Sequence, residues 1–242
     1  DTSDFGMSLV SSLKAFNSAG KLATWLVVPL DFAHYISVAA LSGFRFHHAE
    51  GDTATMVLWM RPNEPSRIPP FATHQVGVGG LVVRGGPDDN PEDPHVLVIR
   101  EAGRNYTNFK LPGGLCDVAE DFGDAAVREV REETGVEAEF SRILTMRHQH
   151  GMQFGRSDIY CIALLRATSV DVAIDTNELE DARWMKLSEF RENSPHEMVE
   201  HAIQAATGEG GAVGLQEKEL KSVVPGRVPY KLYYATSGAI AK

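Results

Sequence analysis

Three glutamates within little more than one helical turn are the residues of this sequence best suited to chemistry. Glu129, Glu132 and Glu133 stand at positions i, i+3 and i+4, so in a helix they share one face. Carboxylates this close repel one another and raise one another's pKa values. A hard cation removes both penalties, because Mg²⁺ prefers carboxylate oxygens and commonly bridges to substrate phosphates. The spacing therefore indicates a divalent-cation site that acts on phosphates.

The residues around these glutamates favour the same interpretation. Arg128 precedes the cluster and can fix a carboxylate in one rotamer through a charge-assisted hydrogen bond. Ala126 and Val130 provide small apolar packing on the other side of the expected helix. Gly135 is placed to end the helix. Residues 111–114 (LPGG) form a turn at which the backbone can approach a ligand closely.

Residues 114–136 match the pattern Gly-x5-Glu-x7-Arg-Glu-U-x-Glu-Glu-x-Gly-U, where U is apolar, at each of its positions. The matching residues are Gly114, Glu120, Arg128, Glu129, Val130, Glu132, Glu133, Gly135 and Val136. A solvated acidic helix with local salt bridges would explain the glutamates alone. It would not explain why Gly114, Glu120 and Gly135 keep register with them. The segment resembles the signature of the Nudix hydrolases, which cleave a nucleoside diphosphate linked to another moiety X.

This resemblance implies an α/β/α sandwich with a mixed sheet and a requirement for Mg²⁺ or Mn²⁺. By position in the motif, Glu132 and Glu133 resemble the paired metal ligands and Glu129 a third ligand. The carbonyl of Gly114 resembles the backbone ligand. Glu120 resembles the loop glutamate that either braces the motif or joins the metal site.

The implied reaction is attack of water on one phosphorus of the diphosphate, with a glutamate accepting the proton. Glu133 and Glu129 are both candidates for that base, and Arg128 supports them. Glu178, six residues before Trp184, resembles a glutamate that reaches the site from outside the motif in many members. An ordinary loop carboxylate is the alternative interpretation of Glu178.

The residues that precede the motif indicate which Nudix subfamily the chain resembles. Residues 46–60 (FHHAEGDTATMVLWM) and 72–83 (ATHQVGVGGLVV) are similar to the Nudix subfamily of the animal antisense fibroblast-growth-factor protein and its plant ADP-ribose/NADH pyrophosphatase relatives. This implies hydrolysis of an ADP-containing metabolite, ADP-ribose or NADH, to AMP and a phosphorylated product. The proline that marks many ADP-ribose hydrolases is absent between Val136 and Pro195. The substrate prediction thus depends on the subfamily alone.

Two other functions stay open at this point. A nucleotide-sensing or partner-binding module would use the same fold with little turnover, although the complete set of glutamates favours an enzyme. Hydrolysis of capped RNA ends or of coenzyme A is a further alternative. The net charge of −10, from 23 basic and 33 acidic residues, makes nucleic acid an unlikely partner, since binding a phosphate backbone requires basic surface.

Several residues outside the motif have side chains that bind ligands in other proteins. His47 and His48 are adjacent, so on a regular strand they should point to opposite faces. His148 and His150 should share a face, where a phosphate or base contact competes with simple surface polarity. Candidates for phosphate pairing or base stacking are Arg147, Arg156, Phe154 and Tyr160, with a core position as the commoner outcome for the aromatic residues.

The whole-chain pattern predicts mixed α/β structure in three parts. Residues 1–70 form a small α/β unit that ends in a proline-rich connection, residues 71–207 form the Nudix domain, and residues 208–242 form a glycine-rich break and a tail. Strands are expected at 23–28, 44–49, 53–60, 75–84, 95–100, 138–150 and 156–166, and helices at 7–18, 30–41, up to 134, and 195–206. Residues 228–235 (VPYKLYYA) are expected as an aromatic strand or an interface segment. The first unit has too few strands for a stable core, which predicts a homodimer in which this unit covers part of the partner or part of its own Nudix domain.

The remaining features concern the cellular setting. Cys116 and Cys161 do not make a disulfide framework and are expected as free thiols in a reducing compartment. No apolar run reaches the length of a membrane span. A cytoplasmic location follows as the expectation. Because the chain begins at Asp1 rather than Met, a mitochondrial or other organellar location after removal of a leader is the alternative.

Overall fold

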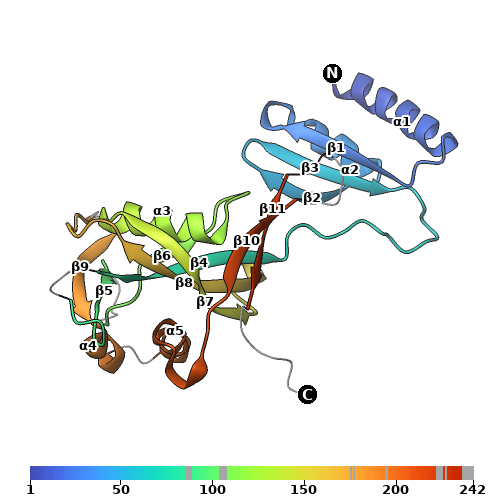
Figure 1. Ribbon diagram of the computed structural model, residues 1–242. Coiled ribbons are helices and arrows are strands. Elements are labelled where there is room, and N and C mark those ends of the chain that lie inside the picture. The colour runs from blue at the N-terminus through green and yellow to red at the C-terminus, as the bar shows by residue number, and fades with distance from the viewer. Residues whose placement is uncertain are drawn as a thin grey trace, which may run out of the picture. The chain divides into compact units, whose positions relative to one another are not determined.

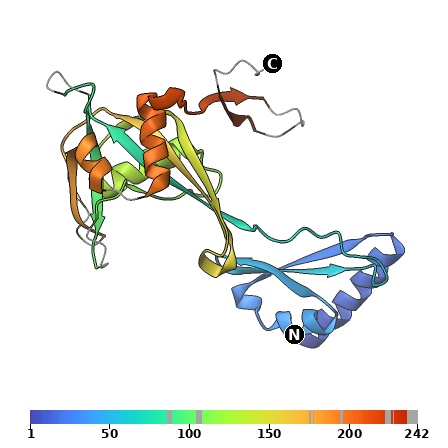
Figure 2. The same ribbon diagram turned by 90° about the horizontal axis from the view of Figure 1, so that it is seen from below.

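The computed structural model describes residues 1–85, 89–103, 108–174, 176, 178–193, 196–221, 226 and 228–235. The chain divides into two compact units, Asp1–Thr73 and His74–Lys242 (Figures 1 and 2). The division into three domains at residues 70 and 207 stays a prediction. Within the described ranges, no helix is both long and apolar enough to cross a membrane.

The first unit is a three-stranded antiparallel sheet with helices on one face. Its elements are α1 (Thr2–Ser18), β1 (Ala23–Pro29), the short 3-10 turn η1 (Leu30–Phe32), α2 (Tyr35–Leu41), β2 (Arg45–Glu50) and β3 (Thr53–Trp59). The strand order is β1-β3-β2. Leu9 from α1, Ala39 from α2 and Met56 from β3 are buried together in a small core. The opposite face of this sheet has no helix of its own unit over it (Figure 2).

The second unit contains a mixed sheet. Its elements are β4 (His74–Val83), β5 (His95–Glu101), β6 (Gly113–Leu115), α3 (Phe122–Thr134), β7 (Ala138–Gln149), the 3-10 turn η2 (Gln153–Gly155), β8 (Ser157–Ala167), β9 (Leu179–Lys186), α4 (Leu187–Asn193), α5 (Glu197–Thr207) and the 3-10 turn η3 (Glu209–Gly211). The strand order is β7-β8-β4-β5-β9, and β6 pairs with the first half of β4. β4 and β8 run parallel, whereas the other described pairs are antiparallel.

Helices cover both faces of this sheet. α3 packs on one face over a core that includes Val78 and Leu165. α4 and α5 pack on the other face over a core that includes Leu81 and Phe190, as Figure 1 shows. This is the α/β/α sandwich with a mixed sheet that the sequence predicted. Alternation along β4 explains the arrangement, since successive side chains point to opposite faces.

The tail folds back onto the second unit. β10 (Gln216–Leu220) and β11 (Tyr230–Tyr234) form an antiparallel hairpin. Leu215, just before β10, exchanges backbone hydrogen bonds with Ile143 of β7 at 2.7 and 3.1 Å. Tyr233 stacks on Phe122 at the start of α3, with ring centroids 5.2 Å apart. The aromatic tail therefore supports the helix that carries the glutamates.

One local expectation was wrong. His47 and His48 do not point to opposite faces, because β2 carries a bulge between Phe46 and His48. A bulge inserts an extra residue and breaks the alternation of side chains. The two imidazoles instead meet, with Nδ1 to Nδ1 at 2.7 Å.

Candidate active site

The motif helix ends as its sequence predicts. Ala125, Ala126 and Val130 are buried against the sheet. Gly135 has a φ of +69°, and its N–H donates to the carbonyl of Arg131 at 2.9 Å. This left-handed terminus suits glycine, which has no Cβ to oppose it. With its apolar side buried, α3 presents its glutamates away from the core.

Arg128 binds three of the acidic side chains. Its Nε and Nη2 donate to the two carboxylate oxygens of Glu120, both at 2.8 Å. Its Nη1 donates to Glu129 at 2.9 Å and to Glu132 at 3.1 Å. The fork to Glu120 is the bidentate geometry for which arginine is suited, and it lowers the pKa of Glu120. Glu120 also accepts from the N–H of Asp117 at 2.9 Å, so it braces the loop before α3.

Glu133 lies apart from this network. Its carboxylate accepts a hydrogen bond from the N–H of Gly113 at 2.8 Å. Gly113 has a φ of +152°, and a Cβ there would lie 2.1 Å from the carbonyl oxygen of Val78, so only glycine fits this turn. Burial raises the pKa of Glu133 to about 7, opposed by the Gly113 hydrogen bond and by Lys110.

Glu129 lies directly against β6. A Cβ placed on Gly114 would be 2.6 Å from a carboxylate oxygen of Glu129, so the absence of a side chain at Gly114 makes room for this carboxylate. Burial raises the pKa of Glu129, although Arg128 opposes the rise. Glu132, by contrast, is exposed over 57% of its side chain. The helix therefore presents two carboxylates to the glycine turn and one to solvent.

Glu178 comes from the turn before β9. Its backbone carbonyl accepts from the N–H of Ala102 at 2.9 Å, which fixes the turn against β5. Its charge contributes to the raised pKa of Glu133, so the two carboxylates lie within electrostatic reach.

A polar surface on the sheet adjoins Glu133, here called the Tyr160 shelf. It consists of Gly77, Gly79, Arg147, Asp158 and Tyr160. Tyr160 lies across both glycines, because a Cβ on Gly77 would be 2.8 Å from its ring and one on Gly79 would be 2.6 Å from its hydroxyl. The guanidinium of Arg147 lies 5.3 Å from the ring centroid and donates to Asp158 at 2.7 Å.

The shelf and the motif meet through β4. Gly79 pairs with Gly113, whose N–H binds Glu133. Burial raises the pKa of Tyr160 to about 12, and the charge of Glu133 adds to the rise. Gly77, Gly79 and Asp158 were missed by the sequence analysis. The alternating glycines of residues 76–80 (VGVGG) were the available signal, since glycine inside a strand often marks close approach of another group.

The other sequence candidates lie elsewhere on the sheet. His148 contacts His74, with Nε2 to Nε2 at 2.9 Å, and His150 contacts the hydroxyl of Ser157 at 2.8 Å. Phe154 is 91% exposed at the β7–β8 connection. Cys161 is buried and Cys116 half-buried, and both are free thiols. Arg156 is half-buried just before β8.

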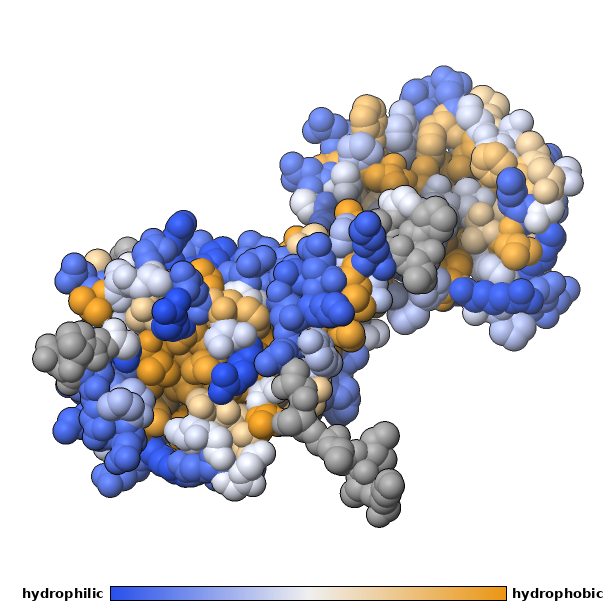
Figure 3. All heavy atoms as spheres, viewed as in Figure 1, coloured by the Kyte–Doolittle hydropathy of each residue, from blue (hydrophilic) through white to orange (hydrophobic). Residues whose placement is uncertain are grey.

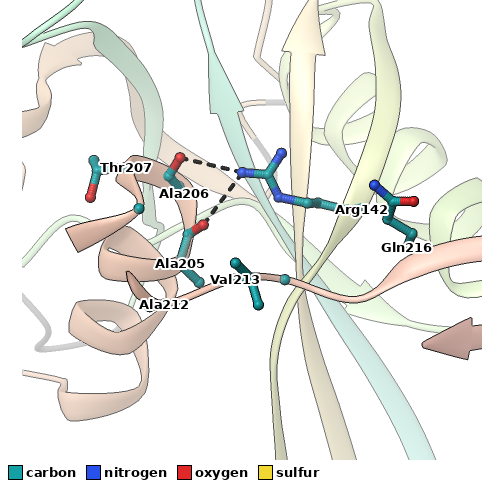
Figure 4. Close-up of a pocket in the computed structure, with 9 residues that line it drawn as sticks. Arg142, Ala205, Ala206, Thr207, Ala212, Val213 and Gln216 are labelled. Atoms are coloured by element: carbon teal, nitrogen blue, oxygen red, sulfur yellow. Dashed lines mark hydrogen bonds between the residues drawn. The ribbon is translucent and has the colours of Figure 1, made fainter. Parts of the chain in front are cut away.

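A separate cavity of about 350 Å³ lies between the end of α5 and residues 212–216. Arg142 points into it and donates to the carbonyls of Ala205 and Ala206, both at 3.4 Å (Figure 4). A cation at a helix C-terminus satisfies carbonyls that have no intrahelical partner. Arg142 therefore stabilises the end of α5 from within this cavity.

The carboxylates also bear on whether a cation fits. Among the described residues, no three acidic, histidine or cysteine side chains converge as a ready metal-ligand group, because Arg128 binds Glu129 and Glu132 while Gly113 binds Glu133. The donors are nevertheless all oxygens, and two of the carboxylates are buried enough to raise their pKa values. Such a set fits a hard divalent cation.

Comparison with known proteins agrees with this arrangement. Residues 73–204 match the family model described as the NUDIX domain, and residues 1–60 match one described as the Nudix hydrolase domain. Nucleoside diphosphate-linked moiety X motif 6 of Homo sapiens is 35% identical over 97% of this chain and 74% of its own length. Nudix hydrolase 8 of Arabidopsis thaliana is 35% identical over 95% of this chain and 62% of its own length. The Xenopus laevis counterpart of the first protein is 44% identical over 64% of this chain and 69% of its own length.

A mixed sheet between helix layers, with an intact glutamate motif at its glycine turn, defines a Nudix fold. The chain belongs to the Nudix hydrolase family. It is accordingly a hydrolase of nucleoside diphosphate-linked compounds.

Proposed function

We propose that this chain is a divalent-metal-dependent pyrophosphatase that hydrolyses an ADP-containing metabolite, ADP-ribose or NADH, to AMP and a phosphorylated product. The observation that carries the proposal is the placement of Glu129 and Glu133 against the glycine turn of β6, directly beside the Tyr160 shelf. The subfamily resemblance supports the choice of ADP-ribose and NADH within the class of diphosphate-linked nucleosides.

The residues that would hold Mg²⁺ or Mn²⁺ are Glu129 and Glu132 with the carbonyl of Gly114, and Glu133 would join them where Glu129 is the base. When bound there, the cation would neutralise the phosphates and polarise the attacking water. Glu120 supports the site indirectly, because the guanidinium that it fixes also orients Glu129 and Glu132.

The chain itself supplies the base. The water oxygen forms the new bond to phosphorus, the anhydride P–O bond breaks, and the water proton passes to a glutamate. We assign this role to Glu133, because it is not paired with Arg128 and is held by a single backbone hydrogen bond. Glu129 is the alternative base, but Arg128 already occupies one of its oxygens. The negative charge of Glu178 contributes to the raised pKa of Glu133, which favours the protonated product of that step.

The Tyr160 shelf would bind the part of the substrate beyond the diphosphate. Arg147 offers N–H donors suited to a phosphate or a ribose oxygen, and Asp158 fixes its orientation. The hydroxyl of Tyr160 lies over Gly79, which pairs with Gly113 of the glycine turn. The shelf would thus contact the moiety X and contribute to discrimination among substrates.

A substrate panel tests the proposal. ADP-ribose, NADH, coenzyme A and a capped RNA oligonucleotide would be incubated with Mg²⁺ or Mn²⁺ and with the wild type, Glu133→Gln, Glu129→Gln or Glu137→Gln. Glu137 is exposed just after the motif and serves as the matched control. We expect the fastest turnover on ADP-ribose or NADH, and loss of turnover without metal. Tight binding of nucleotides with no turnover by any metal form would show a sensing module instead.

We also propose that the protein is a homodimer in which the first unit provides the contact. The supporting observation is the large amount of apolar surface on that unit. Met7, Val27, Leu30 and Leu41 are each exposed over more than half of their area, and Figure 3 shows hydrophobic residues gathered on its surface.

A further inference from the structure

The first unit has two sheet edges, and they differ in protection. β2 is bulged and carries Arg45 and Glu50. The proline-rich segment also lies on it, since His47 Nε2 contacts the carbonyl of Pro69 at 2.9 Å and His48 stacks on Phe71 at 4.5 Å. Bulges, charges and covering segments are the devices by which edge strands avoid pairing with another chain. The β2 edge is therefore protected.

The β1 edge has almost none of these devices. Its seven residues, ATWLVVP, include no charged side chain. Its register with β3 continues without a bulge from Ala23↔Trp59 to Pro29↔Thr53. Among the described residues, β3 is its one strand neighbour. Pro29 alone interrupts the edge, at its last position.

The backbone groups that point outward from β1 follow from the ladder. The N–H of Leu30 donates to Asp52 and the carbonyl of Leu22 accepts from Met60. Hydrogen-bonded pairs alternate in an antiparallel ladder, so the even-numbered residues of β1 bond inward to β3. Trp25 and Val27 therefore direct both N–H and carbonyl away from the sheet. Their side chains are also 48% and 59% exposed.

We propose that this edge pairs with β1 of a second copy of the chain, antiparallel across a two-fold axis at Leu26, to form one continuous sheet. In this register Trp25 exchanges two backbone hydrogen bonds with the partner's Val27, and Val27 does the same with the partner's Trp25. Both pairs join outward-directed residues, as an antiparallel ladder requires. They are also aromatic with β-branched pairs, which stabilise sheets. The proposal specifies the interface of the homodimer proposed above.

The charges beside the strand favour a second copy as the occupant. Lys21 precedes β1 and Asp31 follows it in η1, with no charge between them. Antiparallel pairing about Leu26 brings Lys21 of each copy to the Asp31 end of the other. The segment is thus self-complementary, apolar in the middle with opposite charges at its ends. A two-fold interface requires such self-complementarity.

Light scattering after size-exclusion chromatography tests the interface. The variants are Val27→Lys on β1 and Phe46→Lys on β2, whose side chain is 65% exposed. At a protein concentration of about 50 µM, which would detect a dimer of micromolar affinity, we expect the wild type and Phe46→Lys to have a molar mass twice that of one chain. Val27→Lys should elute as a monomer with unchanged circular dichroism, because that side chain points away from the core. Its turnover of the best substrate should be unchanged, which separates this test from the proposed function.

A crosslink keeps the test decisive where Val27→Lys folds poorly. Leu26 faces its own copy as a non-hydrogen-bonded pair, with Cα atoms about 4.5 Å apart, within the range of a disulfide. Leu26→Cys should form a covalent dimer under mild oxidation, whereas Phe46→Cys and wild type should not. A monomeric wild type, or a dimer that survives Val27→Lys without crosslinking at Leu26→Cys, would overturn the proposal.

Discussion

The acidic face of α3 and the Tyr160 shelf meet beside Glu133, yet they are built in opposite ways. The acidic face comes from one continuous stretch, and Arg128 binds two of its carboxylates, Glu129 and Glu132, together with Glu120 in the preceding loop. The shelf comes from β4, β7 and β8, which contribute Gly77, Arg147 and Tyr160 from distant parts of the sequence. The position of Tyr160 in the shelf depends on packing, because its ring lies directly against Gly77 and Gly79, which have no side chains.

The difference suggests a division of labour. In the proposed function, the acidic face would supply the reacting groups that any diphosphate substrate requires. The shelf would contact the moiety attached to the diphosphate, so a change there would alter substrate preference rather than the reaction. Changes to the helix should therefore lower kcat, whereas changes to the shelf should affect stability and KM first.

The largest effect should follow loss of the proposed base. Glu133→Gln should lower kcat by at least about 10²-fold, the usual contribution of a general base, with the fold retained. Glutamine keeps an acceptor for the N–H of Gly113 but cannot take the proton. Steady-state turnover beside the control Glu137→Gln measures this. Turnover at the wild-type rate would show that Glu133 is not the base.

A smaller loss of kcat should follow when Arg128 no longer holds the carboxylates of the acidic face in place. Arg128→Lys keeps the charge but loses the fork to Glu120 and reaches fewer carboxylates. We expect kcat to fall about 10-fold, which corresponds to an activation free energy higher by about 1.4 kcal/mol, because the carboxylates are less well ordered. The melting temperature should fall as well. Arg131→Lys, exposed on the same helix, is the control and should change neither. Equal behaviour of the two variants would contradict the role of Arg128.

The shelf can be tested by a double-mutant cycle. Gly79→Ala places a Cβ 2.6 Å from the Tyr160 hydroxyl, and such overpacking costs about 1–3 kcal/mol of unfolding free energy. In a Tyr160→Phe background the nearest ring atom is 3.3 Å away, so most of that cost should vanish. Gly77→Ala meets the ring itself at 2.8 Å and should not be rescued. Urea denaturation measures the unfolding free energy of each variant. If Gly79→Ala lowers it equally in the wild-type and Tyr160→Phe backgrounds, the contact between Gly79 and the Tyr160 hydroxyl is refuted.

The smallest effect concerns stability in the presence of chelator. Burial raises the pKa of Glu133 to about 7 from 4.5, so between these values the folded state binds more protons than the unfolded state. Its contribution to stability is therefore present at low pH and lost as pH rises through about 7. The melting temperature of Glu133→Gln at pH 8 should therefore be no lower than that of the wild type. If the substitution removes about 1 kcal/mol of destabilisation, the melting temperature should rise by about 2–4 °C.

Glu120 should behave in the opposite sense. Its pKa is lowered by Arg128, so its stabilising contribution is present at neutral pH and is lost as pH falls. Glu120→Gln should therefore melt below wild type at pH 8 in chelator. Glu129→Gln and Glu132→Gln should not lower the melting temperature, because like charges are removed from one face. A marked drop for both would show that these carboxylates act as structural partners of Arg128 instead.

The sequence by itself determined the chemistry of the motif and most of the elements. Residues 114–136 contain the helix, its glycine end and its acidic face within a few turns, so helical spacing alone places these groups together. Binary patterns likewise predicted the strands at 23–28 and 75–84, which the structure confirms as β1 and β4. The pairing of β10 with β11 was not foreseen, because residues 216–220 (QEKEL) are polar and lack a strand-like pattern.

Only the tertiary structure decided which residues surround that motif. Strand register determines that Tyr160 lies beside Gly77 and that Gly79 faces Gly113, and register depends on the burial of whole faces rather than on local sequence. A single bulge brought His47 against His48, against the expected alternation. Likewise, the exposed character of β1 appeared only when the sheet order made it an edge. Local spacing specifies a reactive face, whereas long-range pairing specifies what that face meets.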